Sequence, residues 1–219
     1  MATTGHGTVW SMPIETVMID ALDGVRLRAD LMRVDAPVGG VVLTHPHPLF
    51  GGDRFNPIID TLFGLLPEAG FTTVRFDFRG VNESSGVHDD GDSERLDVLA
   101  AVELLEFAQP DSPTWLVGYS FGSVVALNVV DARVSGWVAV APPLAAVAGR
   151  VLASTDHRPK LLLVPSRDQF SPPETAAPII EAWANTAMRP IDGADHFLSG
   201  HVQRIADDIV AHLTRQRRR

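Results

Sequence analysis

The chain has 219 residues, enough to bury one sizeable core, and its 45% hydrophobic and 21% charged residues are an ordinary globular balance. Its formal net charge of −9 argues against a nucleic-acid-binding protein, which needs a basic surface. The absence of cysteine excludes disulfide bonds, thiolate metal ligands and a cysteine nucleophile.

The order of β-like and helical segments predicts the fold class. The chain opens with two β-like runs, 14–20 and 25–33, on either side of Asp23-Gly24, a strong hairpin signal. Apolar runs typical of strands covered on both faces follow at 39–44, 72–78, 114–118, 136–141 and 161–164, with a weaker one at 188–191. Helical spacing of apolar residues separates them, at 56–68, 93–107, 120–130, 173–187 and 199–213. We therefore predict an α/β fold, with a mostly parallel, doubly wound sheet after an N-terminal antiparallel hairpin, in a single domain over 1–219.

Targeting and membrane signals are missing from the sequence. Residues 1–13 lack the basic start and apolar stretch of a secretory signal. No uninterrupted apolar stretch approaches the roughly 18 residues that a membrane-spanning helix needs. We therefore expect a cytoplasmic protein without a membrane partner, and we interpret the basic cluster at 215–219 as a solvated end of the last helix.

A possible catalytic serine lies between a strand and a helix. Gly118-Tyr119-Ser120-Phe121-Gly122 has the G-x-S-x-G spacing, directly after an apolar strand and directly before a small, apolar helix. This strand–turn–helix context is what a nucleophile elbow requires, because the turn exposes the serine hydroxyl above a helix N-terminus. The alternative is an ordinary glycine-flanked turn with a serine N-cap. The context favours Ser120 as the nucleophile.

A serine nucleophile needs a general base and an acid that orients the base. His196 follows the last predicted strand in a turn-rich segment, whereas His201 and His212 fall in the terminal helix, where we expect solvated side chains. Asp168 follows the predicted strand 161–164 in a loop; Asp195 competes as the acid, but it is the neighbour of His196 and would struggle to reach the far ring nitrogen. The resulting chain order is Ser120, Asp168 and His196, which is the order that this fold uses for a nucleophile, an acid and a base.

The loop after the strand at 39–44 is the expected source of an oxyanion-hole donor. The first donor is the backbone N–H of Phe121, the residue after the nucleophile. In the segment His45-Pro46-His47-Pro48-Leu49 the prolines carry no N–H, so His47 is the first choice for the second donor and Leu49 the second choice. A His-x-His pair can also signal a metal site, but two ligands are too few, and the acidic stretch 88–92 is explained by the start of a helix. We predict no metal and no cofactor.

Several segments together resemble the α/β-hydrolase superfamily over nearly the whole chain. They are HPHPLFGG at 45–52, FDFRGVNESSG at 76–86, GYSFGS at 118–123, APP at 141–143, PSRD at 165–168 and GADHF at 193–197. The chain is most similar to small, cap-less bacterial hydrolases related to the dienelactone hydrolase group. Dienelactone hydrolases use a cysteine nucleophile, so their reaction does not carry over to this serine sequence, and the aspartate nucleophile of dehalogenases is disfavoured for the same reason. The resemblance implies ester hydrolysis as the default activity and says little about the substrate.

The short connection from 142 to 160 leaves room for one short helix, near 145–152, and for no cap domain. The site should therefore be shallow and open, and suited to substrates that are small or presented by a larger molecule. The candidate pocket walls, each also an ordinary core candidate, are Leu49, Phe50, Tyr119, Phe121, Leu144, Phe170 and Phe197.

The predicted function is that of a serine esterase acting on a small-molecule ester through an acyl-Ser120 intermediate. The same catalytic residues would serve a thioesterase, a peptidase or an acyltransferase. A non-catalytic binding module on a hydrolase scaffold is a third alternative. The sequence indicates neither the natural substrate nor the oligomeric state.

Overall fold

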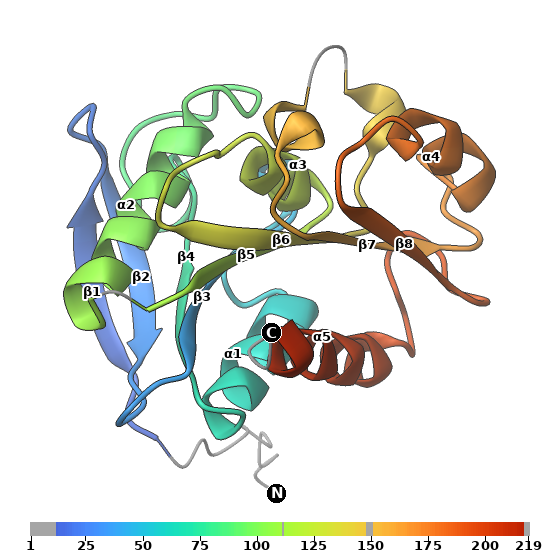
Figure 1. The fold of residues 1–219 in the computed structure, drawn as a ribbon. Coiled ribbons are helices and arrows are strands. Elements are labelled where there is room, and N and C mark those ends of the chain that lie inside the picture. Colours follow the sequence, from blue (N-terminus) through green and yellow to red (C-terminus); the bar gives the residue numbers. More distant parts are fainter. Residues whose placement is uncertain (1–11, 111, 148–150, 217–219) are drawn as a thin grey trace, which may run out of the picture.

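The computed structural model describes residues 12–110, 112–147 and 151–216, and these residues form one eight-stranded sheet (Figure 1). The strands are β1 (Glu15–Asp20), β2 (Arg26–Met32), β3 (Gly39–Thr44), β4 (Phe71–Phe76), β5 (Thr114–Tyr119), β6 (Val134–Val140), β7 (Lys160–Pro165) and β8 (Thr186–Ile191). Their spatial order is β1-β2-β4-β3-β5-β6-β7-β8. The pairs β1–β2 and β2–β4 are antiparallel, and all the other pairs are parallel.

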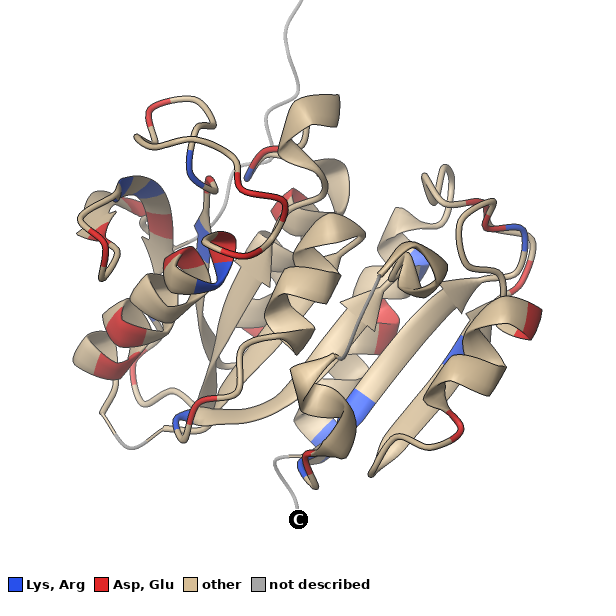
Figure 2. Ribbon diagram, turned by 90° about the horizontal axis from the view of Figure 1, so that it is seen from above, with Lys and Arg blue, Asp and Glu red and all other residues tan. Residues whose placement is uncertain are grey.

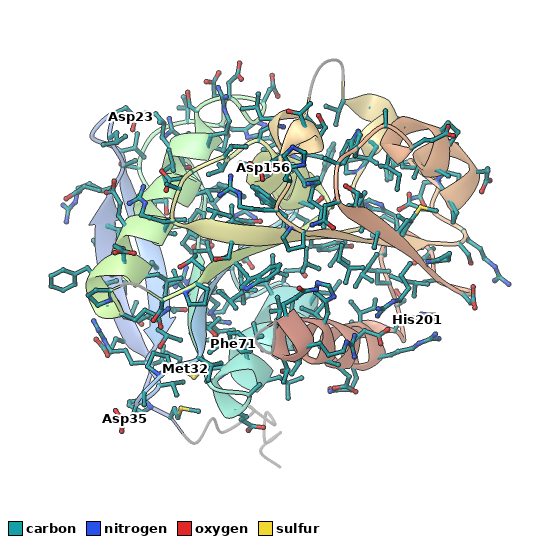
Figure 3. All side chains as sticks on the ribbon, viewed as in Figure 1. Asp23, Met32, Asp35, Phe71, Asp156 and His201 are labelled. Carbon is teal, nitrogen blue, oxygen red and sulfur yellow. The ribbon has the colours of Figure 1, made fainter. Side chains whose placement is uncertain are left out.

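Helices cover both faces of the sheet. They are α1 (Pro57–Glu68), α2 (Glu94–Ala108), α3 (Phe121–Leu127), α4 (Pro173–Ile180) and α5 (Val202–Gln216). Figure 1 shows α1 and α5 on one face and α2, α3 and α4 on the other. Each face has its own apolar core; Met32 and Phe71 belong to the core beneath α1 and α5, as Figure 3 shows. Because both faces are covered, all six residues of β3, β4, β5 and β7 are buried, which explains why these strands are mostly apolar.

The predicted fold class is confirmed: a mostly parallel α/β sheet with an N-terminal antiparallel hairpin, and no cap domain among the described residues. No helix in the described part of the chain is both long and apolar enough to cross a membrane. Of the basic cluster at 215–219, residues 217–219 lie outside the described residues.

Two helical predictions were wrong in extent. The helix predicted over 173–187 ends at Ile180, after which the Trp183 N–H donates to the Ile180 carbonyl in a turn. Asn185, with a φ of 41°, then reverses the chain into β8. In place of the short helix predicted near 145–152, the structure has two 3-10 turns, Leu144–Ala146 and Leu152–Thr155; residues 148–150 lie outside the described residues.

Candidate active site

Ser120 occupies the single position between β5 and α3, and its backbone conformation is unusual. Its φ of 51° and ψ of −120° lie in a region that residues with a side chain rarely adopt. Such strain persists only where the surrounding structure holds the residue in place, and it is common at functional sites. The Ser120 N–H donates to the Val140 carbonyl on the neighbouring strand at 2.8 Å, which ties the turn to the sheet.

The close approach of strand, turn and helix requires glycine on both sides of the serine. A Cβ at Gly122 would come within 2.4 Å of the His45 carbonyl oxygen, and a Cβ at Gly118 would come within 2.5 Å of the Ser123 Cα. The Thr44 hydroxyl donates to the Gly122 carbonyl at 2.9 Å. The spacing G-x-S-x-G therefore follows from packing, since the helix start sits against the end of β3.

Three predicted site residues from separate strand ends lie in one hydrogen-bonded chain. The Ser120 Oγ lies 2.8 Å from the Nε2 of His196, and the His196 Nδ1 lies 2.8 Å from the Oδ2 of Asp168. All three residues are buried, with at most 9% of their surface exposed. The competing acid, Asp195, instead accepts a hydrogen bond from the Leu198 N–H at 3.0 Å. The structure thus joins Asp168, and not Asp195, to the histidine.

The environment of Asp168 keeps its carboxylate charged. Burial is the largest single influence and would raise the pKa of Asp168, but the hydrogen bond from His196, the backbone hydrogen bonds and the charge of His196 together outweigh it. The backbone N–H groups of Phe170 and Ser171 also donate to this carboxylate, at 2.8 and 3.3 Å. The pKa of Asp168 therefore lies below its usual value, and an ionised carboxylate is available to orient an imidazole and to stabilise its protonated form.

Tyr119 holds the backbone of His196 in place. Its hydroxyl donates to the backbone carbonyl of His196 at 2.9 Å. Burial, together with the charges of Asp168 and Asp195, raises the pKa of Tyr119 to about 12, so the phenol stays protonated and remains a donor. The rings of Phe170 and His196 pack in a T-shaped arrangement, with 4.6 Å between centroids.

The loop after β3 folds into a tight turn around His47. The His47 carbonyl accepts hydrogen bonds from the N–H groups of Phe50, at 3.1 Å, and Gly52, at 3.0 Å. The Leu49 N–H, the second choice for the oxyanion-hole donor, already donates to the Nδ1 of His47 at 3.3 Å. By contrast, the N–H groups of His47 and Phe121 donate to no group among the described residues. Phe121 is the first residue of α3, where a helix leaves its N–H without a partner.

His45 links this loop to the loop after β4. Its Nε2 accepts from the Phe78 N–H at 3.0 Å, and its Nδ1 lies 2.7 Å from the Pro46 carbonyl oxygen. Burial lowers the pKa of His45 to about 4, so the imidazole is neutral at pH 7. The described residues contain no group of three or more histidine, cysteine, aspartate or glutamate side chains placed to hold a metal ion.

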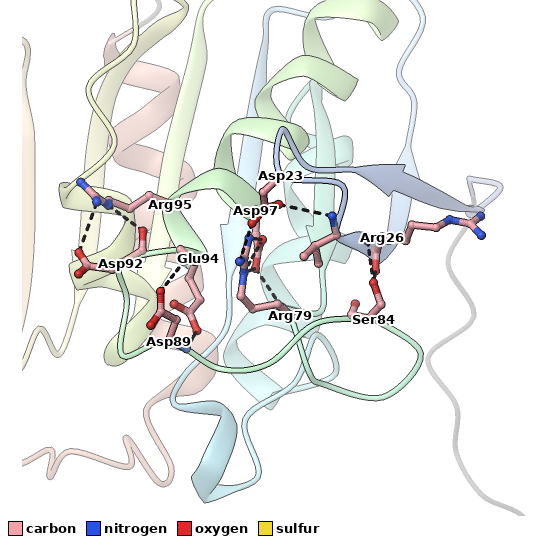
Figure 4. Close-up of polar contacts among 12 residues, drawn as sticks. Asp23, Arg26, Arg79, Ser84, Asp89, Asp92, Glu94, Arg95 and Asp97 are labelled. Atoms are coloured by element: carbon pink, nitrogen blue, oxygen red, sulfur yellow. Dashed lines mark hydrogen bonds and ion pairs between the residues drawn. The ribbon is translucent and has the colours of Figure 1, made fainter.

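Buried ion pairs also join the loop after β3 to the loop after β4, and no sequence prediction included them. Arg54 donates its backbone N–H to the Oδ1 of Asp77 at 2.8 Å, and its guanidinium contacts Asp77 and also Asp30, the latter at 3.2 Å. A second set of ion pairs joins Arg79, in the loop after β4, to Asp97 on α2 and to Asp23 between β1 and β2 (Figure 4). The charged residues interrupting the apolar segment FDFRG at 76–80 were the available signal for these ion pairs.

Six of the seven predicted pocket walls fall into two groups, and the seventh, Phe121, is half-buried. Tyr119 and Leu144 are buried in the apolar cores. Four of the others are exposed around the site: Leu49, Phe50, Phe170 and Phe197. A separate open hollow of about 620 Å³ lies between the loops 48–53 and 79–88, and neither Ser120 nor His196 lines it. The role of these side chains in binding a substrate stays a prediction.

His212 differs from the solvated side chain that we expected. It is half-buried on α5, with its ring edge-on to Trp115 at 6.0 Å between centroids. Burial, with the nearby charges of Arg215 and Arg189, lowers the pKa of His212 to about 4. The histidine therefore belongs to the packing between the helix and the sheet.

Comparison with known proteins identifies the class to which this fold and site belong. Residues 41–217 match the model of the Alpha/beta hydrolase family, and the chain therefore belongs to that family. Among curated proteins, the uncharacterized protein RP471 from Rickettsia prowazekii (strain Madrid E) is 34% identical over 113 residues. That match covers 50% of this chain and 47% of the relative, so the chain spans about half the length of the curated relative that it matches.

Solved structures resemble nearly the whole chain. A protein of unknown function from Agrobacterium tumefaciens has a TM-score of 0.84 at 27% identity, covering 92% of this chain and 96% of that one. An alpha-beta serine hydrolase homologue from Coxiella burnetii has a TM-score of 0.83 at 29% identity, covering 94% and 100%. A serine hydrolase without lid from Xanthomonas campestris shares the fold, with a TM-score of 0.80 at 23% identity over 96% and 97%. The chain is a small, cap-less member of the family, and these relationships support hydrolase activity.

Proposed function

We propose that the protein is a serine hydrolase that cleaves carboxylic esters of small or exposed acyl groups through an acyl-Ser120 intermediate. The observation that carries this proposal is the hydrogen-bonded chain from the Ser120 Oγ through His196 to Asp168, with both links at 2.8 Å. These distances are within the range needed for proton transfer between a nucleophile and its general base.

In the first half of the proposed reaction, the Ser120 Oγ attacks the ester carbonyl carbon while its proton passes to the Nε2 of His196. Asp168, a charged acceptor at the Nδ1, orients the ring and stabilises the imidazolium that forms. The tetrahedral intermediate then collapses: the bond to the leaving oxygen breaks, and the Nε2 proton goes to that oxygen. An alcohol departs and the acyl group stays on Ser120.

In the second half, a water molecule gives a proton to the Nε2 and its oxygen attacks the acyl carbon. The Ser120 Oγ leaves and takes the proton back from the imidazolium, which releases the carboxylic acid and restores the enzyme. The N–H groups of Phe121 and His47 are the proposed donors to the negative oxygen in both halves. They are suited to it because neither donates to another described group.

The proposed substrate range follows from the open surroundings. The short connection between β6 and β7 builds no lid among its described residues, and Leu49, Phe50, Phe170 and Phe197 are exposed around the site. An open site excludes water poorly and encloses little of a ligand. Short acyl esters, or acyl groups carried on a larger molecule, therefore fit better than long free substrates.

Labelling with a fluorophosphonate probe tests the nucleophile. We expect the wild-type protein to be labelled on Ser120 and the Ser120→Ala protein to remain unlabelled. Equal labelling of the two proteins would contradict the proposal.

A substrate panel tests the bond that is cleaved. It compares p-nitrophenyl esters, acyl-CoA thioesters and aminoacyl amides, with an alcohol added as a competing acceptor. We expect the highest kcat/KM with short esters and no net transfer to the alcohol. Turnover only of thioesters or amides would point to a thioesterase or a peptidase, transfer would point to an acyltransferase, and no turnover at all would favour a binding module.

A further inference from the structure

The two residues that carry the proposed oxyanion-hole donors touch each other through their side chains. The ring centroids of His47 and Phe121 lie 4.9 Å apart. A third ring, that of His88, contacts both: its centroid is 4.9 Å from that of His47 and 5.3 Å from that of Phe121. The separation between the loop after β3 and the start of α3 is therefore set in part by a cluster of three rings, one of which belongs to neither donor residue.

His88 comes from a segment that a buried carboxylate holds in place. Glu94, in the first turn of α2, has no exposed surface, and its two oxygens accept hydrogen bonds from the N–H groups of Asp89 and Gly91, both at 2.9 Å (Figure 4). The Phe121 ring lies close to Gly91, at van der Waals distance (3.6 Å) from the position that a Cβ there would take. Hydrogen bonds to Glu94 thus fix the turn at 89–91, and the turn packs against the Phe121 ring.

The His88 side chain is enclosed at this position, with only 10% of its surface exposed. Its Nδ1 lies 2.8 Å from the Oε1 of Glu94 and its Nε2 lies 3.3 Å from the Oδ1 of Asp90. Neither contact is aligned as a hydrogen bond. The rings of His47 and Phe121 and the Glu94 carboxylate therefore surround a side chain to which the proposed mechanism assigns no step. Acidic residues recur on α2 and the loop before it, as the red segments of Figure 2 show.

We propose that His88 is a positioning residue of the oxyanion hole. Its ring, fixed by the turn bound to Glu94, keeps the His47 and Phe121 rings at a set spacing and thereby keeps their backbone N–H groups at the separation that the developing oxyanion requires. The inference rests on the proposed function. Amide donors stabilise a transition state only when they are held at the right place beforehand, and a displacement of about 1 Å can cost on the order of 100-fold in rate.

Kinetics of two substitutions at this position test the role of the ring. His88→Ala removes the ring, and we expect kcat for a short p-nitrophenyl ester to fall about tenfold, with KM changed by less than about twofold, because the missing interaction acts on the transition state. His88→Phe keeps an aromatic ring of similar size and should restore kcat to within about threefold of the wild type. Val87→Ala is the matched control: Val87 is the exposed neighbour, at 77% exposure, and its loss should leave kcat unchanged.

Labelling rates separate this inference from the proposed function. The second-order rate of reaction between Ser120 and a fluorophosphonate should fall in His88→Ala by the same factor as kcat, since the phosphoryl oxygen uses the same donors. If the wild type is not labelled at Ser120, the proposed function fails and the inference fails with it. If the wild type and His88→Ala are labelled at equal rates, only the inference is overturned.

Stability measurements exclude a general loss of structure. The thermal midpoint of each variant is recorded, and the inference is overturned if His88→Phe loses as much kcat as His88→Ala while both stay folded. If His88→Ala does not fold, Glu94→Gln tests the inference instead. In that variant an NH₂ group replaces one of the two carboxylate oxygens, and an NH₂ group cannot accept the hydrogen bond from the N–H of Asp89 or Gly91. We then expect a loss of about threefold in kcat with KM unchanged, and an unchanged kcat in folded Glu94→Gln would overturn the inference.

Discussion

The two sides of the candidate site are held together by different kinds of interaction. On the side of β7 and β8, Asp168 and His196 reach Ser120 through a single chain of side-chain hydrogen bonds. On the side of β3 and β4, the proposed donors to a substrate are backbone N–H groups, which lie among turns, ring contacts and buried ion pairs. A chain of side chains fails when any member is changed, whereas a scaffold that places amides should fail by degrees.

The largest expected effect comes from removing the proposed nucleophile or the proposed base from the chain of side-chain hydrogen bonds. Ser120→Ala and His196→Ala should each lower kcat for ester hydrolysis by about 10⁴-fold or more. Because the two residues act as one unit, the double variant should cost little more than either single one, and kcat of all three proteins measures this. Additive losses would mean that the residues act independently.

The orienting acid gives the next largest effect. Asp168→Asn should lower kcat by roughly 10³- to 10⁴-fold, since an amide cannot stabilise the imidazolium and favours the wrong tautomer. Asp195→Asn is the matched control, because Asp195 bonds only to the Leu198 N–H among the described residues, and its kcat should stay within about threefold. The reverse ranking in steady-state kinetics would reassign the acid.

On the opposite side, Arg54→Met tests the buried ion pairs. It leaves Asp77, which has no exposed surface, without its guanidinium partner, and it leaves Asp30, which is 3% exposed, with Arg75 as its remaining one. We expect the free energy of unfolding in urea to fall by roughly 3–5 kcal/mol. Arg133→Met is the control: Arg133 pairs with Asp131 at a partly exposed position, and its loss should cost less than about 1 kcal/mol. Equal losses would show that burial does not set the value of these pairs.

The smallest effect is a dependence of stability on pH. The pKa of His45 is about 4 in the folded protein against an ordinary 6.5, so between these values the unfolded chain binds a proton that the folded protein does not. Stability should therefore fall as the pH is lowered from 6.5 to 4, by at most about 3 kcal/mol from this residue, and should be unaffected by it above 6.5.

Urea unfolding across this pH range measures that dependence. His212, whose pKa is also about 4, adds to the same window. His45→Gln keeps an acceptor for the Phe78 N–H but does not titrate, and it should reduce the slope; His212→Gln gives the matching value for the second histidine. An unchanged slope in His45→Gln would contradict the assignment.

Local sequence patterns predicted the strands well and the helix ends less well. Each of the eight strands coincides with a predicted β-like run. The central strands, buried on both faces, give a mostly apolar signal, whereas the partly exposed β1 and β2 are marked by the Asp23-Gly24 turn between them. The end of α4 was not predictable, since Trp183 continues the apolar spacing of Ala176 and Ile180 beyond the last helical residue, Ile180. Only the turn through Asn185, needed to start β8, ends the helix there.

The sequence by itself determined the fold class, the glycine-flanked turn at Ser120, and the candidate residues Asp168 and His196. Side chains that react must be of particular types at strand ends, so their identity is visible in the sequence. Only the tertiary structure decided which carboxylate meets His196, which N–H groups are left without a partner, and that Arg54 and His88 brace the loops beside them. The reason is physical: every residue except proline offers the same backbone N–H, and contacts between distant loops depend on how the strands are ordered in space.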